Sequence, residues 1–307
     1  MKRPDDGILL VDKEAGETSH DVVRKVKTAL RCGRRYKIGH AGTLDPFATG
    51  LLVVLLGQGT KLSRFIMAGE KEYLATLELG IETDTLDPTG TVTAVRDVPR
   101  LSEAHIRDTA KRYEGTIRQT PPVYSAVKHQ GARAYKLARK GIAVSLKERE
   151  VTVHALSIVS VALPEITMRI RCAGGTYIRS LAADLARDLG PGGRLKTLRR
   201  LRSGAFDVAC AIQSENILTE ANLREMGIPL TKALPGMDEI AVDEALAEKV
   251  RQGYQPGWNE LIAADDSMHP LKENYVKLVS GQKLLAIIKK SDGGDGHEKV
   301  KFERVFS

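Results

Sequence analysis

One aspartate, Asp45, stands in a loop whose composition points to chemistry. The run 39–50 contains three glycines, one histidine and one proline, and these residue types permit or impose backbone bends. It follows a basic stretch and precedes the apolar run 51–56. A lone carboxylate held in such a bend, beside cationic surface, suits covalent catalysis on a polyanion. The alternative is an ordinary Asp-Pro turn, which the dipeptide by itself favours.

Positive charge is concentrated in the part of the chain that holds this loop. The 307 residues have a formal net charge of +8. Residues 238–307 hold 10 of the 47 Lys and Arg and 13 of the 39 Asp and Glu, so residues 1–237 hold 37 and 26 and carry a net +11. Three basic clusters are Arg24, Lys25, Lys27, Arg31, Arg34, Arg35 and Lys37; Arg194, Lys196, Arg199, Arg200 and Arg202; and Lys128, Arg133, Lys136, Arg139 and Lys140. Such clusters favour a nucleic-acid partner, and the alternative is a set of solvated surface charges.

The common signatures of cofactor and metal chemistry are missing from the sequence. It has no G-x-x-x-x-G-K-[ST] loop, no H-E-x-x-H motif and no zinc-like Cys or His spacing. We therefore expect an enzyme that uses its own side chains, with no cofactor and no metal. The three scattered cysteines fit a reducing compartment. The longest apolar run, 51–56, is too short to cross a bilayer, so we expect a cytoplasmic protein without a membrane partner.

Hydrophobic periodicity predicts an α+β fold. Strands are predicted at 7–11, 51–56, 73–81, 90–95, 151–163 and 166–172, and helices at 19–30, 60–67, 102–113 and 177–189. Because several strands form hairpins, we expect a large mixed, mostly antiparallel sheet flanked by helices. The charge balance changes near 234–236, which predicts a boundary between residues 1–236 and a small β-rich unit, 237–307.

Six stretches of the chain resemble the TruB family of pseudouridine synthases. In chain order they are 7–16 with Asp12-Lys13, 40–52 with His-Ala-Gly-Thr-Leu-Asp-Pro, 71–80, 121–127, 172–183 with Gly-Gly-Thr-Tyr-Ile-Arg, and 198–204. The resemblance covers roughly residues 5–235 and implies the family's fold. It also implies the family's activity, the conversion of the T-loop uridine of tRNA (position 55) to pseudouridine without a cofactor.

The resemblance also implies roles for individual residues. They are Asp45, Tyr73 and Arg179 as catalytic groups, and His40, Tyr73, Tyr177 and Leu198 as substrate-binding groups. Asp45 matches the catalytic aspartate, Tyr73 the tyrosine that stacks on the target base, and His40 the histidine that meets the T loop. Without the resemblance, Tyr73 and Leu198 would be interpreted as core residues, and a lone loop histidine is more often structural.

Chemical reasoning agrees with the roles of the charged pair. An ionised Asp45 must lie out of bulk water, and a buried carboxylate needs a cation, for which Arg179 is the natural partner. The alternative for Arg179 is a surface phosphate contact. The carboxylate can add to C6 of uracil, attack C1′ of the sugar, or assist elimination to a glycal, in which Tyr73 can take the sugar proton. These three routes stay open.

Two further segments take their expected roles from the same resemblance. The polar and basic segment of about residues 120–150 resembles the thumb insertion of stand-alone bacterial enzymes, and the alternative is an ordinary surface loop. Residues 237–307 stand where such enzymes carry a PUA domain, a small RNA-binding β-barrel, and the alternative is a stabilising appendage.

The sequence therefore predicts a monomeric, stand-alone tRNA pseudouridine synthase that flips the target uridine out of the T arm. Two alternatives are a non-catalytic tRNA-folding factor that uses the same basic surface and a guide-RNA-dependent subunit.

Overall fold

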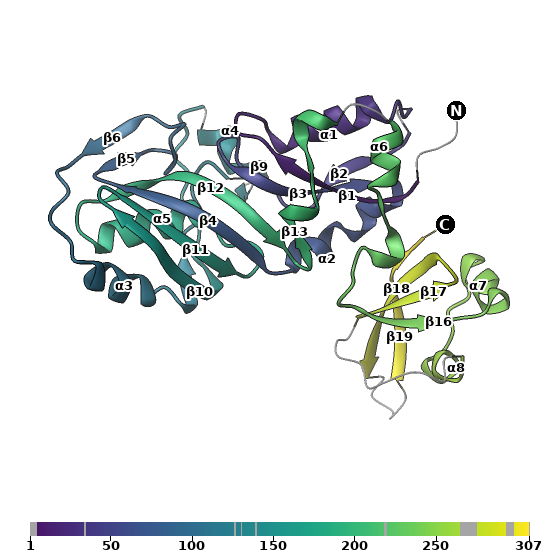
Figure 1. Ribbon diagram of the computed structural model, residues 1–307. Helices are drawn as coiled ribbons and strands as arrows, with labels where there is room; N and C mark the ends of the chain where they lie inside the picture. Colours follow the sequence, from purple (N-terminus) through teal and green to yellow (C-terminus); the bar gives the residue numbers. More distant parts are fainter. Residues whose placement is uncertain are drawn as a thin grey trace.

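The computed structural model describes residues 5–33, 35–125, 127–129, 131–138, 140–217, 220–264, 275–292 and 298–306. Arg34 and Arg139, two members of the basic clusters, lie outside these residues. A large sheet and a four-stranded sheet organise the described chain, with helices packed on both (Figure 1). No helix in the described ranges has the length and apolar character that a membrane span requires.

The large sheet has eleven strands and is mostly antiparallel. They are β1 (Gly7–Lys13), β2 (Ile38–His40), β3 (Thr49–Leu56), β4 (Lys71–Leu79), β7 (Gly115–Gln119), β10 (Arg149–Ala162), β11 (Glu165–Cys172), β12 (Gly193–Ser203), β13 (Phe206–Asp207), β14 (Ile212–Gln213) and β15 (Ile228–Pro229). The main path runs β14-β1-β3-β12-β4-β11-β10-β7. Among the described pairs, β1 with β14 and β3 with β12 are parallel. The predicted α+β class with a mixed, mostly antiparallel sheet is confirmed.

Strand β12 is the central strand that the sequence prediction missed. It pairs with β3 on one side and with β4 on the other. Its residues include the whole second basic cluster, so too few apolar side chains remain to reveal a strand period. This cluster therefore lies between two other strands. Each of its charged side chains must pair with an acceptor on the sheet or extend into solvent.

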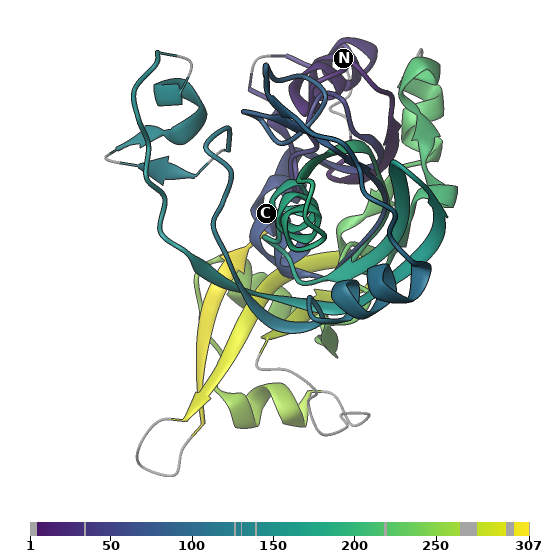
Figure 2. The same ribbon diagram turned by 90° about the vertical axis from the view of Figure 1, so that its left-hand side faces the viewer.

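Helices lie against both faces of the large sheet. They are α1 (Ser19–Ala29), α2 (Ser63–Ala68), α3 (Glu103–Lys111), α5 (Ile178–Asp188) and α6 (Glu220–Glu225), with 3-10 turns at η1 (Gly57–Leu62), η2 (Val208–Cys210), η3 (Ser214–Asn216) and η4 (Leu230–Lys232). Figure 2 shows α5 almost end-on, inside the curve of the sheet. Its residues Leu181, Ala182, Leu185 and Ala186 are fully buried, and it contacts β4 and β12. Helix α5 therefore fills the concave side of the strands that carry Tyr73 and Leu198.

Two neighbouring hydroxyls at the start of helix α1, those of Thr18 and Ser19, have different roles. Thr18 caps the helix: its hydroxyl accepts a hydrogen bond from the Asp21 N–H, and the Asp21 carboxylate accepts one from the Thr18 N–H. Ser19 is thereby free of capping and is buried. Its hydroxyl makes a tertiary contact at the candidate site.

Two excursions leave the large sheet. The first is the hairpin of β5 (Ile81–Thr83) and β6 (Val92–Val95). The second is the segment between β7 and β10, which carries β8 (Lys128–His129), β9 (Ala132–Arg133) and α4 (Ala134–Ala138). Figure 2 shows this second segment projecting from the body of the molecule. It occupies the place at which the sequence predicts an arm.

The four-stranded sheet follows the large sheet in the chain. Its strands are β16 (Asp238–Ala241), β17 (Tyr275–Ser280), β18 (Lys283–Asp292) and β19 (Glu298–Val305), in that spatial order, with α7 (Glu244–Arg251) and α8 (Trp258–Ala263) beside them. The described edge strands β16 and β19 do not pair with each other, so the sheet is open over these residues. A cluster of its own packs around Trp258 and Leu278.

Apolar side chains join the two sheets. Val279, Ile287 and Phe306 of the four-stranded sheet belong to one buried cluster with residues of β1 and β3. At its margin the rings of Phe65 and Tyr275 meet edge to face, with centroids 5.4 Å apart. Because this interface is apolar and buried, the four-stranded sheet supports the strands under the candidate site.

This shared core gives the first prediction. Ile287 is fully buried in the cluster, so Ile287→Ala leaves a cavity between the sheets and should lower the free energy of unfolding by about 2–5 kcal/mol. Chemical denaturation followed by circular dichroism measures the loss. Ile262→Ala is the control, because Ile262 is 40% exposed and should change stability little. Equal effects of the two substitutions would contradict a shared core.

Candidate active site

The backbone on the N-terminal side of Asp45 is held by one buried hydroxyl. Ser19 Oγ accepts a hydrogen bond from the Leu44 N–H at 2.9 Å and donates one to the Leu44 carbonyl at 3.1 Å. Both polar groups of the preceding residue are thus satisfied by the same side chain from α1. Ser19, at the start of α1, therefore fixes the position of the backbone that leads to Asp45.

The backbone on the other side of Asp45 is held by the loop after β1. The Pro46 carbonyl accepts hydrogen bonds from the Gly16 N–H at 2.8 Å and from Lys13 Nζ at 3.3 Å. Lys13 is fully buried and also donates to the Glu14 and Glu17 carbonyls. Burial lowers the pKa of Lys13 to about 8, against the effect of Glu17 and Asp45. The predicted motif around Asp12-Lys13 therefore has a structural task, which is to anchor the turn that presents Asp45.

Asp45 and Arg179 form a two-point ion pair. Arg179 Nε lies 2.9 Å from Asp45 Oδ2, and Arg179 Nη2 donates to Asp45 Oδ1 at 3.1 Å. Arg179 stands in the first turn of α5, and its side chain is only 5% exposed. The predicted pairing of these residues is confirmed as geometry, and Arg179 is too deeply buried to be a surface phosphate contact.

A second carboxylate, Asp87, lies on the far side of the same guanidinium. Arg179 Nη1 is 3.4 Å from Asp87 Oδ2 and donates to the Thr85 carbonyl at 2.9 Å. Asp87 is buried, and its Oδ1 accepts hydrogen bonds from the Thr89 N–H and from the hydroxyls of Thr85 and Thr89. The sequence analysis did not identify Asp87, because only the tertiary fold brings this residue to Arg179.

The charges around Asp45 oppose one another. Burial raises the pKa of the Asp45 carboxyl, Arg179 lowers it, and the negative charge of Asp87 raises it again. The net direction is upward. The side chain keeps 31% of its surface exposed, which leaves an approach for a substrate. Asp45 is thus a reachable carboxylate whose basicity exceeds that of a free aspartate.

Tyr73 and Leu198 meet in the core beside the Asp45 loop. They come from the neighbouring strands β4 and β12, and they share one buried cluster with Leu44. Tyr73 is 8% exposed and Leu198 is 7% exposed. Burial raises the pKa of the Tyr73 hydroxyl, while the positive charge of Arg200 opposes this rise. Both residues, which the sequence predicts as substrate-binding groups, are therefore largely covered by other side chains in this structure.

Tyr177 is held through its backbone. The buried Gln119 side chain accepts a hydrogen bond from the Tyr177 N–H at 2.8 Å and donates one to the Tyr177 carbonyl at 3.0 Å. The Arg149 guanidinium lies over the Tyr177 ring, 4.5 Å from its centroid. Gln119, which sequence reasoning missed, thus links the end of β7 to the start of α5 and so to Arg179.

His40 ends strand β2 and is half-buried. Its buried Nδ1 has no hydrogen-bond partner among the residues that the structure describes. Burial, and then the charge of Arg200, lower the pKa of His40, so the ring is neutral at pH 7. His40 therefore carries a neutral imidazole, and it makes no described hydrogen bond to Asp45.

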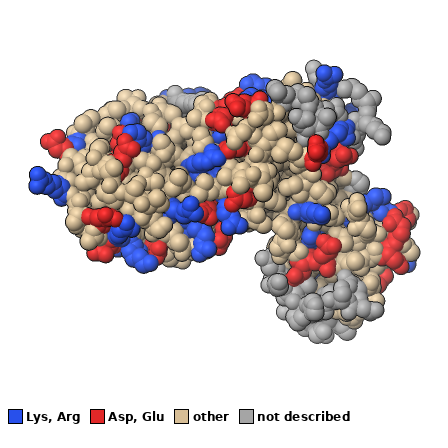
Figure 3. Space-filling view, viewed as in Figure 1, with Lys and Arg blue, Asp and Glu red and all other residues tan. Residues whose placement is uncertain are grey.

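The second basic cluster is mostly neutralised inside the protein. Four of its members pair with carboxylates: Arg194 with Glu78, Lys196 with Glu78 and Glu165, Arg199 with Asp12, and Arg202 with Asp207. On the face shown in Figure 3, basic and acidic side chains are interspersed. This cluster therefore offers less free positive charge to a polyanion than its composition indicates.

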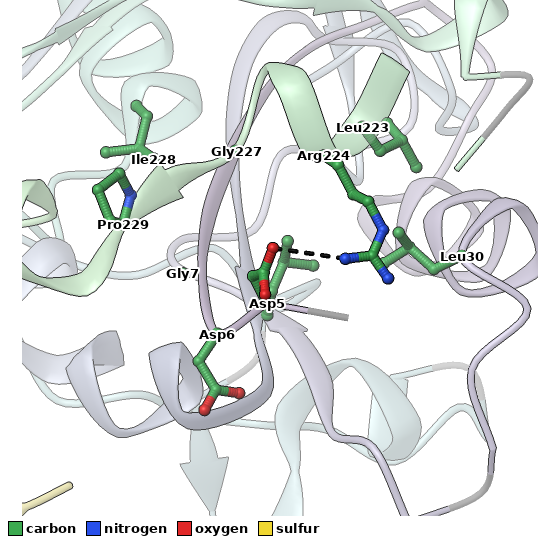
Figure 4. Close-up of a pocket in the computed structure, with 10 residues that line it drawn as sticks. Asp5, Asp6, Gly7, Leu30, Leu223, Arg224, Gly227, Ile228 and Pro229 are labelled. Atoms are coloured by element: carbon green, nitrogen blue, oxygen red, sulfur yellow. Dashed lines mark hydrogen bonds and ion pairs between the residues drawn. The ribbon is translucent and has the colours of Figure 1, made fainter. Parts of the chain in front are cut away.

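A cavity of about 210 Å³ lies away from these residues (Figure 4). Its lining comes from the start of β1, the end of α1 and the segment around α6, and an ion pair of 3.4 Å between Asp5 and Arg224 lies at its wall. None of the site residues predicted from the sequence lines it. Within the described ranges, no group of His, Cys, Asp and Glu is arranged to hold a metal ion.

Comparison with known proteins identifies relatives over most of the chain. A family model described as the TruB family pseudouridylate synthase N-terminal domain matches residues 27–178. The tRNA pseudouridine synthase B of Syntrophus aciditrophicus is 43% identical over 259 residues, which cover 83% of this chain and 82% of that protein. The protein of the same name from Geotalea uraniireducens is 37% identical over 98% of both chains.

Solved structures show the same fold. A chain in a crystal structure of a Cbf5-Nop10-Gar1 complex has a TM-score of 0.72 at 24% identity, over 98% of this chain and 85% of that one. A chain in the structure of an H/ACA RNP bound to a substrate RNA containing 2′-deoxyuridine has a TM-score of 0.70 at 23% identity, over 98% and 85% of the two chains. The predicted pseudouridine-synthase fold is therefore confirmed.

The charge arrangement around Asp45 makes a prediction that needs no substrate. Asp87→Asn removes a negative charge that disfavours the ionised form of Asp45, so the pKa of Asp45 should fall. A carboxyl ¹³C titration measures it, with the Asp45 signal identified by its loss in Asp45→Asn. Asp97→Asn is the matched control, since Asp97 is exposed. An unchanged or raised pKa in Asp87→Asn would show that the two carboxylates are not coupled.

Proposed function

Because the chain belongs to the TruB family of pseudouridylate synthases, we propose that it converts the T-loop uridine of tRNA, at position 55, to pseudouridine. The observation that carries this proposal is the two-point ion pair between the reachable Asp45 and the buried Arg179. The reaction is an isomerisation. The bond from C1′ to N1 breaks, a bond from C1′ to C5 forms, C5 loses its proton and N1 gains one, so the chemistry needs no oxidant and no reductant.

Asp45 supplies the nucleophile in this proposal. The forked contact from Arg179 keeps a carboxylate ionised in surroundings that favour its neutral form. The pKa above the usual aspartate range makes it a stronger nucleophile than a free carboxylate. Addition to C6, attack on C1′ and assistance to glycal formation all begin from this same ionised group, so the ion pair serves each of the three routes.

Tyr73, Leu198 and Tyr177 confine the uracil after it leaves the sugar. A ring face restrains tilt while it allows rotation in the plane, which the reaction requires before C5 can face C1′. Tyr73 is available as the stacking ring, Leu198 as the apolar wall and Tyr177 as the group at the start of α5. Since Tyr73 and Leu198 are almost covered in this structure, the uridine must be flipped out of its loop and side chains must open to admit it.

Recognition of the T arm rests on shape and phosphate contacts. The segment of about residues 120–150 projects from the body and carries the basic residues Arg133 and Lys136, which suits an arm that closes on RNA. The neutral His40 is placed at the end of β2 to fill the space that the flipped base leaves. We also propose that residues 1–236 form the catalytic domain, and that residues 237–307 form a small PUA-like β domain that contacts tRNA in a cytoplasmic, monomeric enzyme.

The alternatives have less support. A non-catalytic tRNA-folding factor has no need for an ionised, two-point-bound carboxylate at a reachable position. A guide-RNA-dependent subunit is favoured by the likeness to Cbf5 complexes, but that likeness is at 24% identity. The relatives at 37% to 43% identity carry the name tRNA pseudouridine synthase B instead.

The test of this function uses an unmodified T-arm stem-loop transcript without guide RNA or cofactor. The wild type should modify one uridine, whereas Asp45→Asn should make no product and keep a Kd within about threefold, because the substitution removes the nucleophile and little surface. Base-specific labelling maps pseudouridine, and Asp97→Asn is the matched control. A wild type that binds tightly and makes no product would favour the alternatives. An active Asp45→Asn variant would show that Asp45 is not the nucleophile.

The raised pKa of Asp45 predicts the acidic limb of the pH–rate profile. The reaction needs the ionised carboxylate, so the single-turnover rate should fall as the pH drops through the pKa of Asp45. That limb should lie above the free aspartate value of about 3.9. RNA affinity measured on Asp45→Asn over the same range separates binding from chemistry. A rate that stays constant down to about pH 4 would contradict the raised pKa.

A further inference from the structure

Arg200 differs from every other member of the second basic cluster. Its neighbours Arg199 and Arg202 keep 38% and 50% of their side chains exposed, whereas Arg200 is 2% exposed. It lies opposite Tyr73 on β4 and opposite Gly50 on β3, next to an irregularity in the pairing of β12 with β4. Its composition-based interpretation as a phosphate contact is therefore wrong, because the side chain is enclosed in the sheet.

The catalytic loop closes around Arg200. Arg200 Nε donates to the Leu51 carbonyl at 2.6 Å, and Nη2 donates to the Gly42 carbonyl at 3.0 Å. Gly42 and Gly50 both have positive φ. A Cβ on Gly50 would lie 2.3 Å from the Arg200 carbonyl oxygen, and one on Gly42 would lie 3.4 Å from Nη1. Two of the glycines that mark this loop in the sequence thus allow it to pack against Arg200.

The charge of Arg200 is not neutralised by a carboxylate. Within the described ranges it takes part in no ion pair, although Arg199 next to it binds Asp12 at 2.6 Å. Its charge adds to burial in lowering the pKa of His40 and Lys71. Burying a cation without a counter-ion is costly, and carbonyl oxygens alone could be satisfied by a neutral donor. The positive charge therefore serves something other than stability.

The group that receives this charge is the Tyr73 hydroxyl. Arg200 stands directly opposite Tyr73 in the pairing of β12 with β4, and its positive charge opposes the rise in the pKa of the Tyr73 hydroxyl that burial causes. A cation beside a phenol favours the deprotonated oxygen, so the charge of Arg200 acts on the proton that Tyr73 carries. The same guanidinium holds the carbonyls of Gly42 and Leu51, which flank the stretch that contains Asp45.

We propose that Arg200 is a positioning residue for catalysis: its buried positive charge acts on the Tyr73 hydroxyl of the opposite strand, and its guanidinium holds the loop that presents Asp45. This role rests on the proposed function only in that Tyr73 must face the uridine during the reaction. Loss of the guanidinium then slows the isomerisation through Tyr73, while the RNA-binding surface is unchanged.

A double-mutant cycle tests this role. Arg200→Met should lower the single-turnover rate on the T-arm transcript by about 100-fold, with a Kd within about threefold, and Arg200→Lys should recover part of the rate. Because Arg200 acts through the hydroxyl, Arg200→Met should cost less than about threefold more when it is added to Tyr73→Phe. Arg202→Met is the matched control from the same strand.

A spectroscopic readout keeps the proposal testable without activity. In protein labelled with ¹³Cζ-tyrosine, the Tyr73 signal is assigned by its loss in Tyr73→Phe. Arg200→Met and Arg200→Lys should shift that signal, and Arg202→Met should not. An inactive wild type that shows the shift would overturn the proposed function alone.

Three outcomes would overturn the role of Arg200. One is an Arg200→Met variant with the wild-type rate. Another is rate losses in Arg200→Met and Tyr73→Phe that multiply in the double variant. The third is an unshifted Tyr73 signal in both Arg200 variants. If Arg200→Met fails to fold, an unshifted signal in Arg200→Lys alone overturns the role.

Discussion

The ion pair between Asp45 and Arg179 is the interaction around which the structure is organised. A carboxylate that is both buried on most sides and ionised needs a cation with fixed geometry, and a flexible surface lysine would not supply it. Arg179 is fixed because it begins α5, and α5 is fixed because it fills the concave side of the large sheet. The position of the ion pair therefore depends on the packing of α5 against the large sheet, because displacing α5 would move Arg179 away from Asp45.

Two buried arginines serve this site in opposite electrostatic ways. Arg179 lies between two carboxylates, Asp45 and Asp87, so its charge is shared and its position is determined from both sides. Arg200 binds carbonyl oxygens, so its charge remains and acts on Tyr73 and His40. The first arrangement favours the ionised form of Asp45, the proposed nucleophile, whereas the second places a positive charge beside the Tyr73 hydroxyl.

The pairing of Asp45 with Arg179 could be predicted from the sequence, because both residues stand in specific motifs. Asp45 was identified from the glycine loop, and Arg179 from the need for a cation together with the resemblance. Asp87, Ser19 and Gln119 were not found, since each acts through a tertiary contact with a residue far away in the chain. A turn aspartate and a helix-start serine look ordinary in sequence, and only the fold decides what lies opposite them.

The same reason explains why β12 was misinterpreted. Composition counts charges without saying where they point, and the run 194–202 looked like a basic surface for phosphates. In the sheet, four of those charges meet carboxylates and the fifth turns inward to the catalytic loop. The positive charge that attracts RNA must then come from elsewhere, such as Arg133 and Lys136 of the projecting segment, and we assign the charge inside the sheet to the proposed chemistry. Net charge therefore indicates the class of partner in this protein, while the burial of each charge determines its task.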